Sequence, residues 1–518
     1  MGLDRKVDGT PNRRRLLQGA VAAGVLGLTG LPLRAQTRGG TLTAALGGAH
    51  SCDTWDSRTH VDLFMMAAAQ GAVFDSLTEI AADGSLKGEL AESWDSSDAQ
   101  TWVFNLRRGV TFHNGQAFGP DDVIASLHLH LDDDVPSPAR PIVQNIAMMA
   151  RSGPHQVTFT LTAPNADFPY LLSDYHLLIY PADHMADAMV HGIGTGLYRV
   201  ETFHPGRRMT ALRVTDHYKG DAAGWFDRID YIAMNDSRAR TEALRAGRVD
   251  AINRVNVRDT AAVAAHPRLR LQNIPGNQHY GFAMQTRAAP FADVDVRLAL
   301  KYGIDRQDFV DRFLLGHGQV GNDTPIGRAN QFYAADLDQI AYDPDRAAFH
   351  RKRAGLDRLA VTLHTSDGAF DGAGHAAAAF ADAARPAGID IDVIDSAPDG
   401  YWAQVWPTAT FRATHWAGRA TEDWMLSTAD AADVLWHDGD SNARFQALLL
   451  QGRSELDSDI RRDIYAYMQQ ILRDTGGTII PAFANHLQGV ANRIGTPSQI
   501  GNLWQMDDAR MAERWWRV

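Results

Sequence analysis

The residues that come closest to a metal-binding pattern are His128 and His130, which are followed by three aspartates at residues 132–134. Imidazole and carboxylate groups together can bind a transition-metal ion. The run at residues 121–130 has a helical pattern, however, and side chains two positions apart on a helix point in different directions. We therefore expect a solvated helix end here and no metal site.

Cys52 is the single cysteine of the chain, and His50 and Asp53 lie close to it in sequence. A thiol nucleophile needs a base beside it in space, which closeness in sequence does not provide, so we expect a small thiol that is buried or partly buried. The sequence contains no HExxH, CxxC, GxSxG or GxxxxGK motif. We therefore expect no catalytic residue and no cofactor, and we expect that the protein is not an enzyme.

The segment HWAGRATEDW, residues 415–424, places a glycine, an arginine and two acids between two tryptophans, and it fits neither a clean strand nor a clean helix. One interpretation is a solvated loop whose tryptophans anchor it to the core. The other is a loop that faces a ligand, because aromatic rings supply contact area and a few fixed polar groups orient a bound molecule. The segment alone leaves both interpretations open.

The chain has 518 residues, of which 45% are hydrophobic and 9% aromatic, and its net charge is -12. This length exceeds one ordinary core, so we expect two or three domains in a globular protein. A general nucleic-acid-binding protein needs a basic face, and an acidic chain argues against that function.

Residues 1–35 have the pattern of an export signal. Arg13, Arg14 and Arg15 precede a mild Leu/Ala/Gly run, and cleavage after Ala35 is plausible. The adjacent arginines resemble the twin-arginine type of signal. An uncleaved membrane anchor is the alternative, although 18 residues with four glycines are marginal for a span. We expect the remaining chain in the periplasm.

The elements that must position these residues follow an α/β pattern. Strand-like alternation occurs at residues 39–46, 101–115, 155–164 and 196–203, and a periodic helical stretch covers residues 294–316. A strand at 359–366, a helix at 374–388 and a strand at 389–396 predict a parallel pair with a crossover. Because no Pro/Ser-rich linker separates the halves, we expect interleaved lobes rather than domains in series.

Residues 90–123, LAESWDSSDAQTWVFNLRRGVTFHNGQAFGPDDV, resemble the signature of the family 5 extracellular solute-binding proteins of ABC transporters. GTGLYRV at 194–200, VRLALKYGIDRQDFVDRFLLGHG at 296–318 and the pattern of residues 359–406 resemble later blocks of that family. The resemblance covers essentially residues 37–518, and the family includes dipeptide, oligopeptide and nickel binders.

This resemblance implies an α/β, two-lobe periplasmic-binding-protein fold with a hinge and an extra subdomain inserted in the first lobe. It also implies a monomer that captures a small peptide-like or anionic molecule and delivers it to an inner-membrane ABC permease. The expected segments are 37–78, 189–285 and 486–518 for lobe 1, 79–188 for the inserted subdomain, and 286–485 for lobe 2.

In peptide-binding members of the family, a tryptophan-containing loop carries an aspartate that holds the α-amino group of the ligand. The loop that resembles it here places Arg419 at that position, shortly after Trp416. A guanidinium repels an ammonium group and can pair with a carboxylate or phosphate. We therefore expect Arg419 to pair with an anionic group and Trp416 to stack beside it. In the alternative, Glu422 or Asp423 neutralises Arg419.

Three further residues are candidates for ligand contact. The resemblance places Trp55 in an early loop of the first lobe that touches ligands in relatives. Tyr280 and His415 lie at strand or loop edges near the expected crossings between lobes. A second interpretation is a metal-chelate carrier similar to the nickel-binding relatives, in which His415 or His279 would contact the metal.

Overall fold

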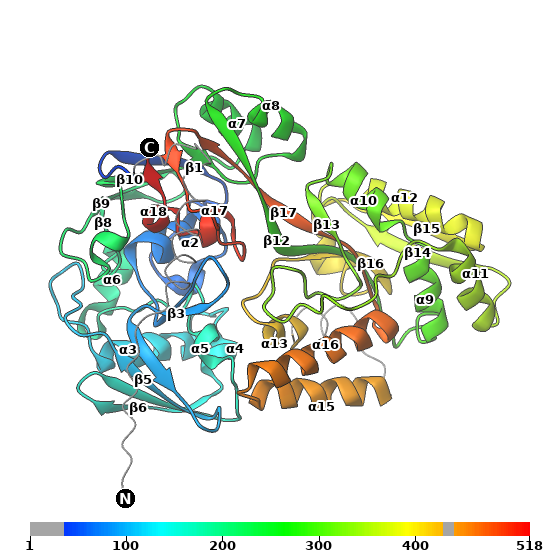
Figure 1. Ribbon diagram of the computed structural model, residues 1–518, viewed down its shortest axis with the longest axis horizontal. Helices are drawn as coiled ribbons and strands as arrows, with labels where there is room; N and C mark the ends of the chain where they lie inside the picture. Colours follow the sequence, from blue (N-terminus) through cyan, green and yellow to red (C-terminus); the bar gives the residue numbers. More distant parts are fainter. Residues whose placement is uncertain (1–35, 428–439) are drawn as a thin grey trace, which may run out of the picture.

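The computed structural model describes residues 36–427 and 440–518, so the predicted export signal lies outside the described residues. Two halves stand side by side, and two long strands, β12 (Leu269–Met284) and β17 (Thr478–Ala491), run from one half into the other (Figure 1). We call the half that contains the C-terminus lobe 1 and the other half lobe 2. The segment boundaries expected from the sequence stay predictions.

One large mixed sheet extends through both lobes in the order β15-β14-β16-β12-β17-β11-β1-β10-β9-β8, and β13 also pairs with β17. On the lobe 1 side the strands are β1 (Thr41–Leu46), β8 (Tyr198–His204), β9 (Arg208–Arg213), β10 (Arg228–Ala233) and β11 (Ala251–Ile252). On the lobe 2 side they are β13 (Gly318–Val320), β14 (Leu359–Thr365), β15 (Ile389–Asp395) and β16 (Phe411–Trp416).

Helices cover this sheet in each lobe. Lobe 1 has α2 (Leu63–Ala68), α6 (Met185–His191), α7 (Ser237–Arg245), α8 (Thr260–Ala264), α17 (Gln505–Asp508) and α18 (Met511–Arg514). Lobe 2 has α9 (Val294–Tyr302), α10 (Arg306–Phe313), α11 (Pro344–Arg353), α12 (Ala373–Ala384), α13 (Glu422–Met425), α15 (Asp440–Ser454) and α16 (Ser458–Thr475). The predicted parallel pair with a helical crossover is confirmed as β14, α12 and β15.

A separate four-stranded sheet forms a subdomain below lobe 1 in Figure 1. Its strands are β4 (Ala91–Asp95), β5 (Thr101–Leu106), β6 (Ile146–Gly153) and β7 (Gln156–Leu161), and its helices are α3 (Pro120–His128), α4 (Arg140–Val143) and α5 (Phe168–Leu171). The small pairs β2 (Thr78–Ile80) with β3 (Leu86–Gly88) and β18 (Ile494–Gly495) with β19 (Trp516–Arg517) complete the strands of the described residues. The subdomain has its own hydrophobic core, in which Phe104, Phe159 and Phe168 pack together.

Three local expectations from the sequence differ from the structure. The periodic stretch 294–316 forms two helices, because Asp305 caps α10 by accepting a hydrogen bond from the Asp308 amide. His130 is fully buried and binds the Ser137 hydroxyl at 2.6 Å, so the predicted solvated helix end is wrong for this residue. Cys52 is exposed rather than buried, because its turn lies at the surface.

The subdomain also contacts lobe 2 directly. Asp167, just before α5, forms a buried ion pair with Arg461 of α16. Beside it, the Ala166 amide donates to the Arg453 carbonyl at 2.7 Å. The two lobes therefore meet at the subdomain as well as along the long strands.

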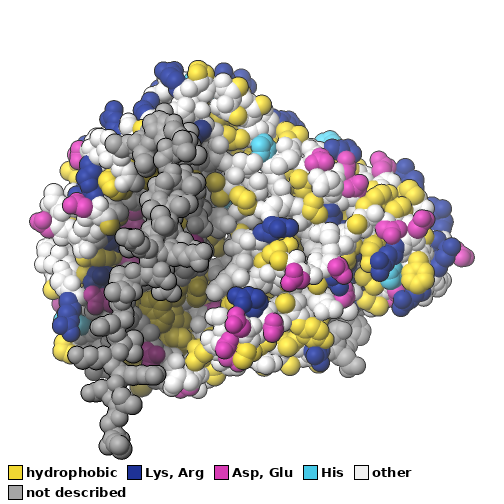
Figure 2. Space-filling view, viewed as in Figure 1, with side chains coloured by type: hydrophobic (Ala, Val, Ile, Leu, Met, Phe, Trp, Pro, Cys, Tyr) yellow, Lys and Arg dark blue, Asp and Glu magenta, His cyan; other side chains and the backbone are white. Residues whose placement is uncertain are grey.

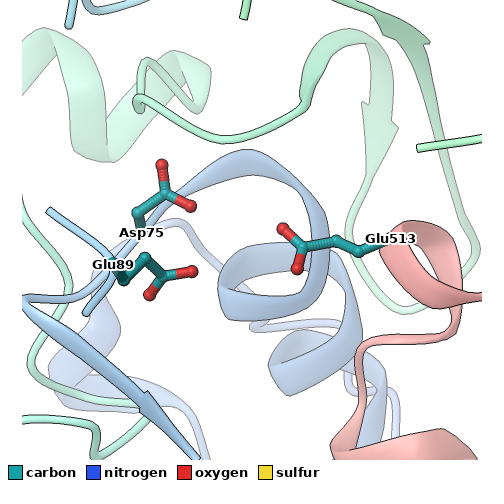
Figure 3. A group of neighbouring side chains, drawn as sticks. All are labelled: Asp75, Glu89 and Glu513. Carbon is teal, nitrogen blue, oxygen red and sulfur yellow. The ribbon is translucent and has the colours of Figure 1, made fainter. Parts of the chain in front are cut away.

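A buried ion cluster fastens the C-terminal helix α18 to lobe 1. Asp75, Glu89 and Glu513 converge from three segments of the chain (Figure 3), and they are the only set of acidic, histidine or cysteine side chains with metal-ligand spacing in the described part of the chain. Lys219 Nζ lies 2.8 Å from carboxylate oxygens of both Glu89 and Glu513, and Arg510 lies 2.8 Å from Glu89. These cations neutralise the carboxylates, so the cluster is a network of ion pairs within the fold.

The surface shown in Figure 2 carries basic and acidic side chains interspersed, without one large patch of either sign. No helix within residues 36–427 and 440–518 is both long and apolar enough to cross a membrane.

Lys219→Met should destabilise the protein strongly, because it leaves the carboxylates of Asp75, Glu89 and Glu513 facing one another with less neutralisation. Breaking a buried ion pair by removing one partner costs roughly 3–5 kcal/mol. Urea unfolding followed by circular dichroism measures the change, and Lys87→Met, at an exposed position, is the matched control. Equal and small losses in both variants would contradict the structural importance of the cluster.

Candidate ligand-binding site between the lobes

The register of β12 against β16 decides which of the predicted residues share a face of the sheet. Tyr280 lies opposite His415, and His279 lies opposite Trp416. Opposed residues of an antiparallel pair point to the same side, and consecutive residues point to opposite sides. Tyr280 and His415 therefore belong to one face of the crossing strands, whereas His279 and Trp416 belong to the other.

The face with Tyr280 forms the floor of a wide groove between the lobes. Its volume is about 900 Å³, and its walls come from α7 and the segment before α8 in lobe 1 and from α10 and the start of α12 in lobe 2. Tyr280 stacks on Phe370 with ring centroids 4.6 Å apart, and the His415 ring contacts Trp402 at 5.5 Å. Polar residues of the groove include Arg254, Arg258, Gln278, Arg312 and Asp371.

The opposite face packs inside lobe 2. Trp416 lies against the core formed by α13, α15 and α16, and His279 lies beside Phe483 with centroids 5.5 Å apart. His279 is buried, and burial lowers its pKa to about 3. Its imidazole is therefore neutral, and its Nδ1 has no hydrogen-bond partner among the described residues.

Arg419 lies beyond the end of β16, in a short loop that ends where Thr421 caps α13. Its guanidinium donates to the carbonyls of Ala417 and Gly418 at 3.3 Å, and it lies 5.9 Å from the Trp416 ring and 5.6 Å from the Trp424 ring. Burial lowers the pKa of Arg419. In the part of the chain that the structure describes, this half-buried cation forms no ion pair.

The two acids that follow Arg419 in sequence have other partners. Glu422 is buried and accepts a hydrogen bond from the Phe332 amide at 2.8 Å. Asp423 pairs with Arg453 at 2.8 Å. Neither acid pairs with Arg419. The structure therefore differs from the alternative in which Glu422 or Asp423 neutralises this residue.

A second, small cavity surrounds the Arg419 side chain at the boundary of the lobes. Its other walls include Asp174 and Tyr175, from the segment after α5, Trp424 of α13, and Trp504, just before α17. The Tyr175 and Trp504 rings meet edge to face with centroids 5.7 Å apart, and burial raises the pKa of the Tyr175 hydroxyl. The adjacent residues Trp504 and Gln505 line the small cavity and the wide groove respectively, so the two spaces are neighbours.

Sequence reasoning missed Asp174, Tyr175 and Trp504. They lie more than 80 residues from Arg419 in either direction, in segments without a recognisable motif. The two aromatic residues flank polar turns, which is a weak signal that many surface loops share. Only the contact between the subdomain, the C-terminal segment and lobe 2 brings them together.

Trp55 lies apart from both cavities. Its ring is 1% exposed and packs in the core of lobe 1, 4.6 Å from the Phe203 ring. The Gly192 backbone is close enough that an added Cβ would contact the Trp55 ring at 2.8 Å. Trp55 therefore packs inside lobe 1 and lines neither of the two cavities.

The sequence matches the profile of the family described as bacterial extracellular solute-binding proteins, family 5, over residues 85–443. The chain belongs to this family. The resemblance seen in the sequence motifs is thereby confirmed for most of the chain.

Among similar proteins, the di/tripeptide-binding protein 1 of Pseudomonas aeruginosa is 28% identical over 318 residues. That alignment covers 56% of this family 5 chain and 59% of the relative, so it spans about three-fifths of the relative's length.

Two solved structures have the same fold. One is the periplasmic binding protein DppA of Helicobacter pylori in complex with the peptide STSA, with 20% identity and a TM-score of 0.74, covering 93% of this chain and 99% of the other. The second is AgaA of A. tumefacien R10 in complex with agropinic acid, with 21% identity and a TM-score of 0.74, covering 92% and 99%. The predicted two-lobe α/β fold is confirmed.

Glu422→Gln should stabilise this family 5 protein more at pH 8 than at pH 5. Burial, with the nearby charge of Asp167, raises the pKa of Glu422 to about 7 from its ordinary 4.5. The folded state thus holds the proton more tightly than the unfolded state, and stability falls as the pH rises from about 4.5 through 7. Glutamine keeps an oxygen for the Phe332 amide and cannot ionise.

The melting temperature at the two pH values measures this difference, and we expect an extra gain at pH 8 of about 1–3 °C. The control is Glu92→Gln on the exposed side of β4. A gain that is the same at both pH values would contradict a raised pKa at Glu422.

Proposed function

We propose that this family 5 protein captures a small solute that carries an anionic group between its two lobes and delivers it to an ABC importer. The observation that carries the proposal is Arg419, a half-buried cation without an acidic partner among the described residues, at the boundary of the lobes. Burying a charge is unfavourable unless it is paired, so a bound anion would supply the missing interaction.

The chemistry of the guanidinium defines the group that Arg419 would bind. A carboxylate or phosphate can accept two parallel hydrogen bonds from it, whereas an ammonium group is repelled. In the peptide binders that the sequence resembles, an aspartate at this position holds the ligand's amino group. With Arg419 at that position, binding of an ordinary peptide through its N-terminal ammonium on this residue is disfavoured.

The wide groove supports the capture of a whole small molecule. A volume of about 900 Å³ falls within the range on the order of 300–1,000 Å³ that small-molecule sites occupy. Tyr280, stacked on Phe370, offers an aromatic surface, and His415 shares its face of the strands. A solute held between two lobes gains contacts that exist only when the lobes are closed, which is how binding would favour the closed form.

The proposed location is the periplasm, and the proposed partner is an inner-membrane ABC permease. The permease would bind the protein as a monomer in its closed form. The family is described as extracellular, and the relatives named above are binding proteins rather than enzymes. These points support a carrier without catalytic activity. The predicted export signal at residues 1–35 would place the chain there.

Arg419→Gln should weaken binding of the anionic solute roughly 10- to 100-fold, because hydrogen bonds to charged groups contribute about 1.5–3 kcal/mol. The solute for this test is the one that raises the melting temperature most in a screen of anionic and neutral small molecules, since a ligand of the folded state stabilises it by mass action. Isothermal calorimetry then gives the affinities.

Arg462→Gln is the matched control, because Arg462 is an exposed arginine on α16 that pairs with Asp459. Its affinity for the solute should stay within about twofold of the unmodified protein. The proposal fails if Arg419→Gln behaves like this control, or if only solutes without an anionic group bind.

A further inference from the structure

The small cavity between the lobes has an opposite charge on each side. Arg419 enters it from lobe 2, and Asp174 enters it from the segment that follows α5. Asp508 and Arg510 also line the cavity, but Asp508 accepts hydrogen bonds from the Leu503 and Trp504 amides, and Arg510 pairs with Glu89. The charge of Asp174 acts on Arg419, yet the two form no ion pair within 4.0 Å. The charges of Arg419 and Asp174 are thus close enough to attract each other but too far apart to form a salt bridge.

Asp174 is held in place as an ion by His176, two residues further along the same segment. Its Oδ1 accepts hydrogen bonds from the His176 amide at 2.9 Å and lies 2.7 Å from His176 Nδ1. Burial alone would raise the pKa of Asp174, but the interactions with His176 outweigh it, and the pKa lies below its ordinary value. No hydrogen bond to Oδ2 occurs among the residues that the structure describes, so this oxygen remains for another donor.

We propose that this cavity binds a zwitterionic headgroup in which a carboxylate and an ammonium share one carbon, as in an α-amino acid, with the carboxylate on Arg419 and the ammonium on Asp174. This proposal rests on the proposed function and names the chemical class of its solute. An anion without the ammonium would meet Arg419 but would also face the Asp174 carboxylate, and a cation alone would face Arg419. A headgroup with both charges would pair with both Arg419 and Asp174.

The cavity has room for the charged ends of a headgroup only, and a bulky group is excluded from it. Its volume is about 30 Å³, which is room for roughly two water molecules. The rings of Tyr175, Trp424 and Trp504 close its sides. The remainder of the solute would extend past Trp504 toward the wide groove, whose lining begins at the next residue, Gln505.

A matched panel of solutes tests the proposal on the unmodified protein by calorimetry. The panel contains the common L-amino acids and their N-carboxyethyl derivatives, which keep both charges, together with the Nα-acetyl derivative and the methyl ester of each. We expect at least one zwitterion to bind tenfold or more tightly than both its acetyl derivative, which lacks the ammonium, and its methyl ester, which lacks the carboxylate.

Two variants assign the two charges. Asp174→Asn should abolish the preference for the free amine over the acetyl derivative, and Arg419→Gln should abolish the preference for the free acid over the ester. Circular dichroism and melting temperature check that each variant is folded. If Asp174→Asn does not fold, the panel on the unmodified protein decides by itself.

The outcomes separate this proposal from the broader one. Acetylated anions that bind as tightly as the zwitterions would overturn the zwitterion proposal and leave an anion carrier. Binding of esters but not of acids would overturn both. If no zwitterion of the panel binds, while other anions from the screen do, the proposed headgroup is wrong.

Discussion

The long antiparallel pair of β12 and β17 is the constraint on which the rest of the molecule depends. The two strands pair from Leu269 with Ala491 to Ala283 with Thr478, and they belong to both lobes. A slip of one residue would turn every side chain to the other face, so the pair fixes which residues the lobes present to each other. The register is interrupted between Pro275 and Gln278 and again between Tyr280 and Phe282, where bulges bend a strand and increase its twist.

The electrostatic character of the site follows from a contrast within the chain. Lys219 and Arg510 lie among carboxylates, and Arg461 is paired with Asp167 where the subdomain meets lobe 2. Arg419 has no such partner among the described residues, because the acids that follow it bind the Phe332 amide and Arg453. The carboxylates that line its cavity, Asp174 and Asp508, both lie outside lobe 2. A cation without an acidic partner at a contact between the lobes is suited to bind an anionic group of a solute.

The sequence predicted the family and the α/β class, because each has a local pattern or a motif, whereas the role of the loop after Trp416 in ligand binding stays a prediction. It could not predict the faces of the crossing strands, since these depend on the register between segments more than 130 residues apart. In the structure, Tyr280 and His415 lie on the opposite face of the strands from Trp416, and Trp55 is a core residue. Asp174 and Trp504 carry no local signal, and only the packing of the subdomain and the C-terminal segment on lobe 2 brings them to Arg419.

The most direct measurement is a crystal structure of the protein with the solute that binds most tightly in the screen. The account predicts density for the solute between the lobes, with an anionic group within about 3 Å of the Arg419 guanidinium. A solute bound away from the contact between the lobes, or a neutral or cationic group against Arg419, would contradict it.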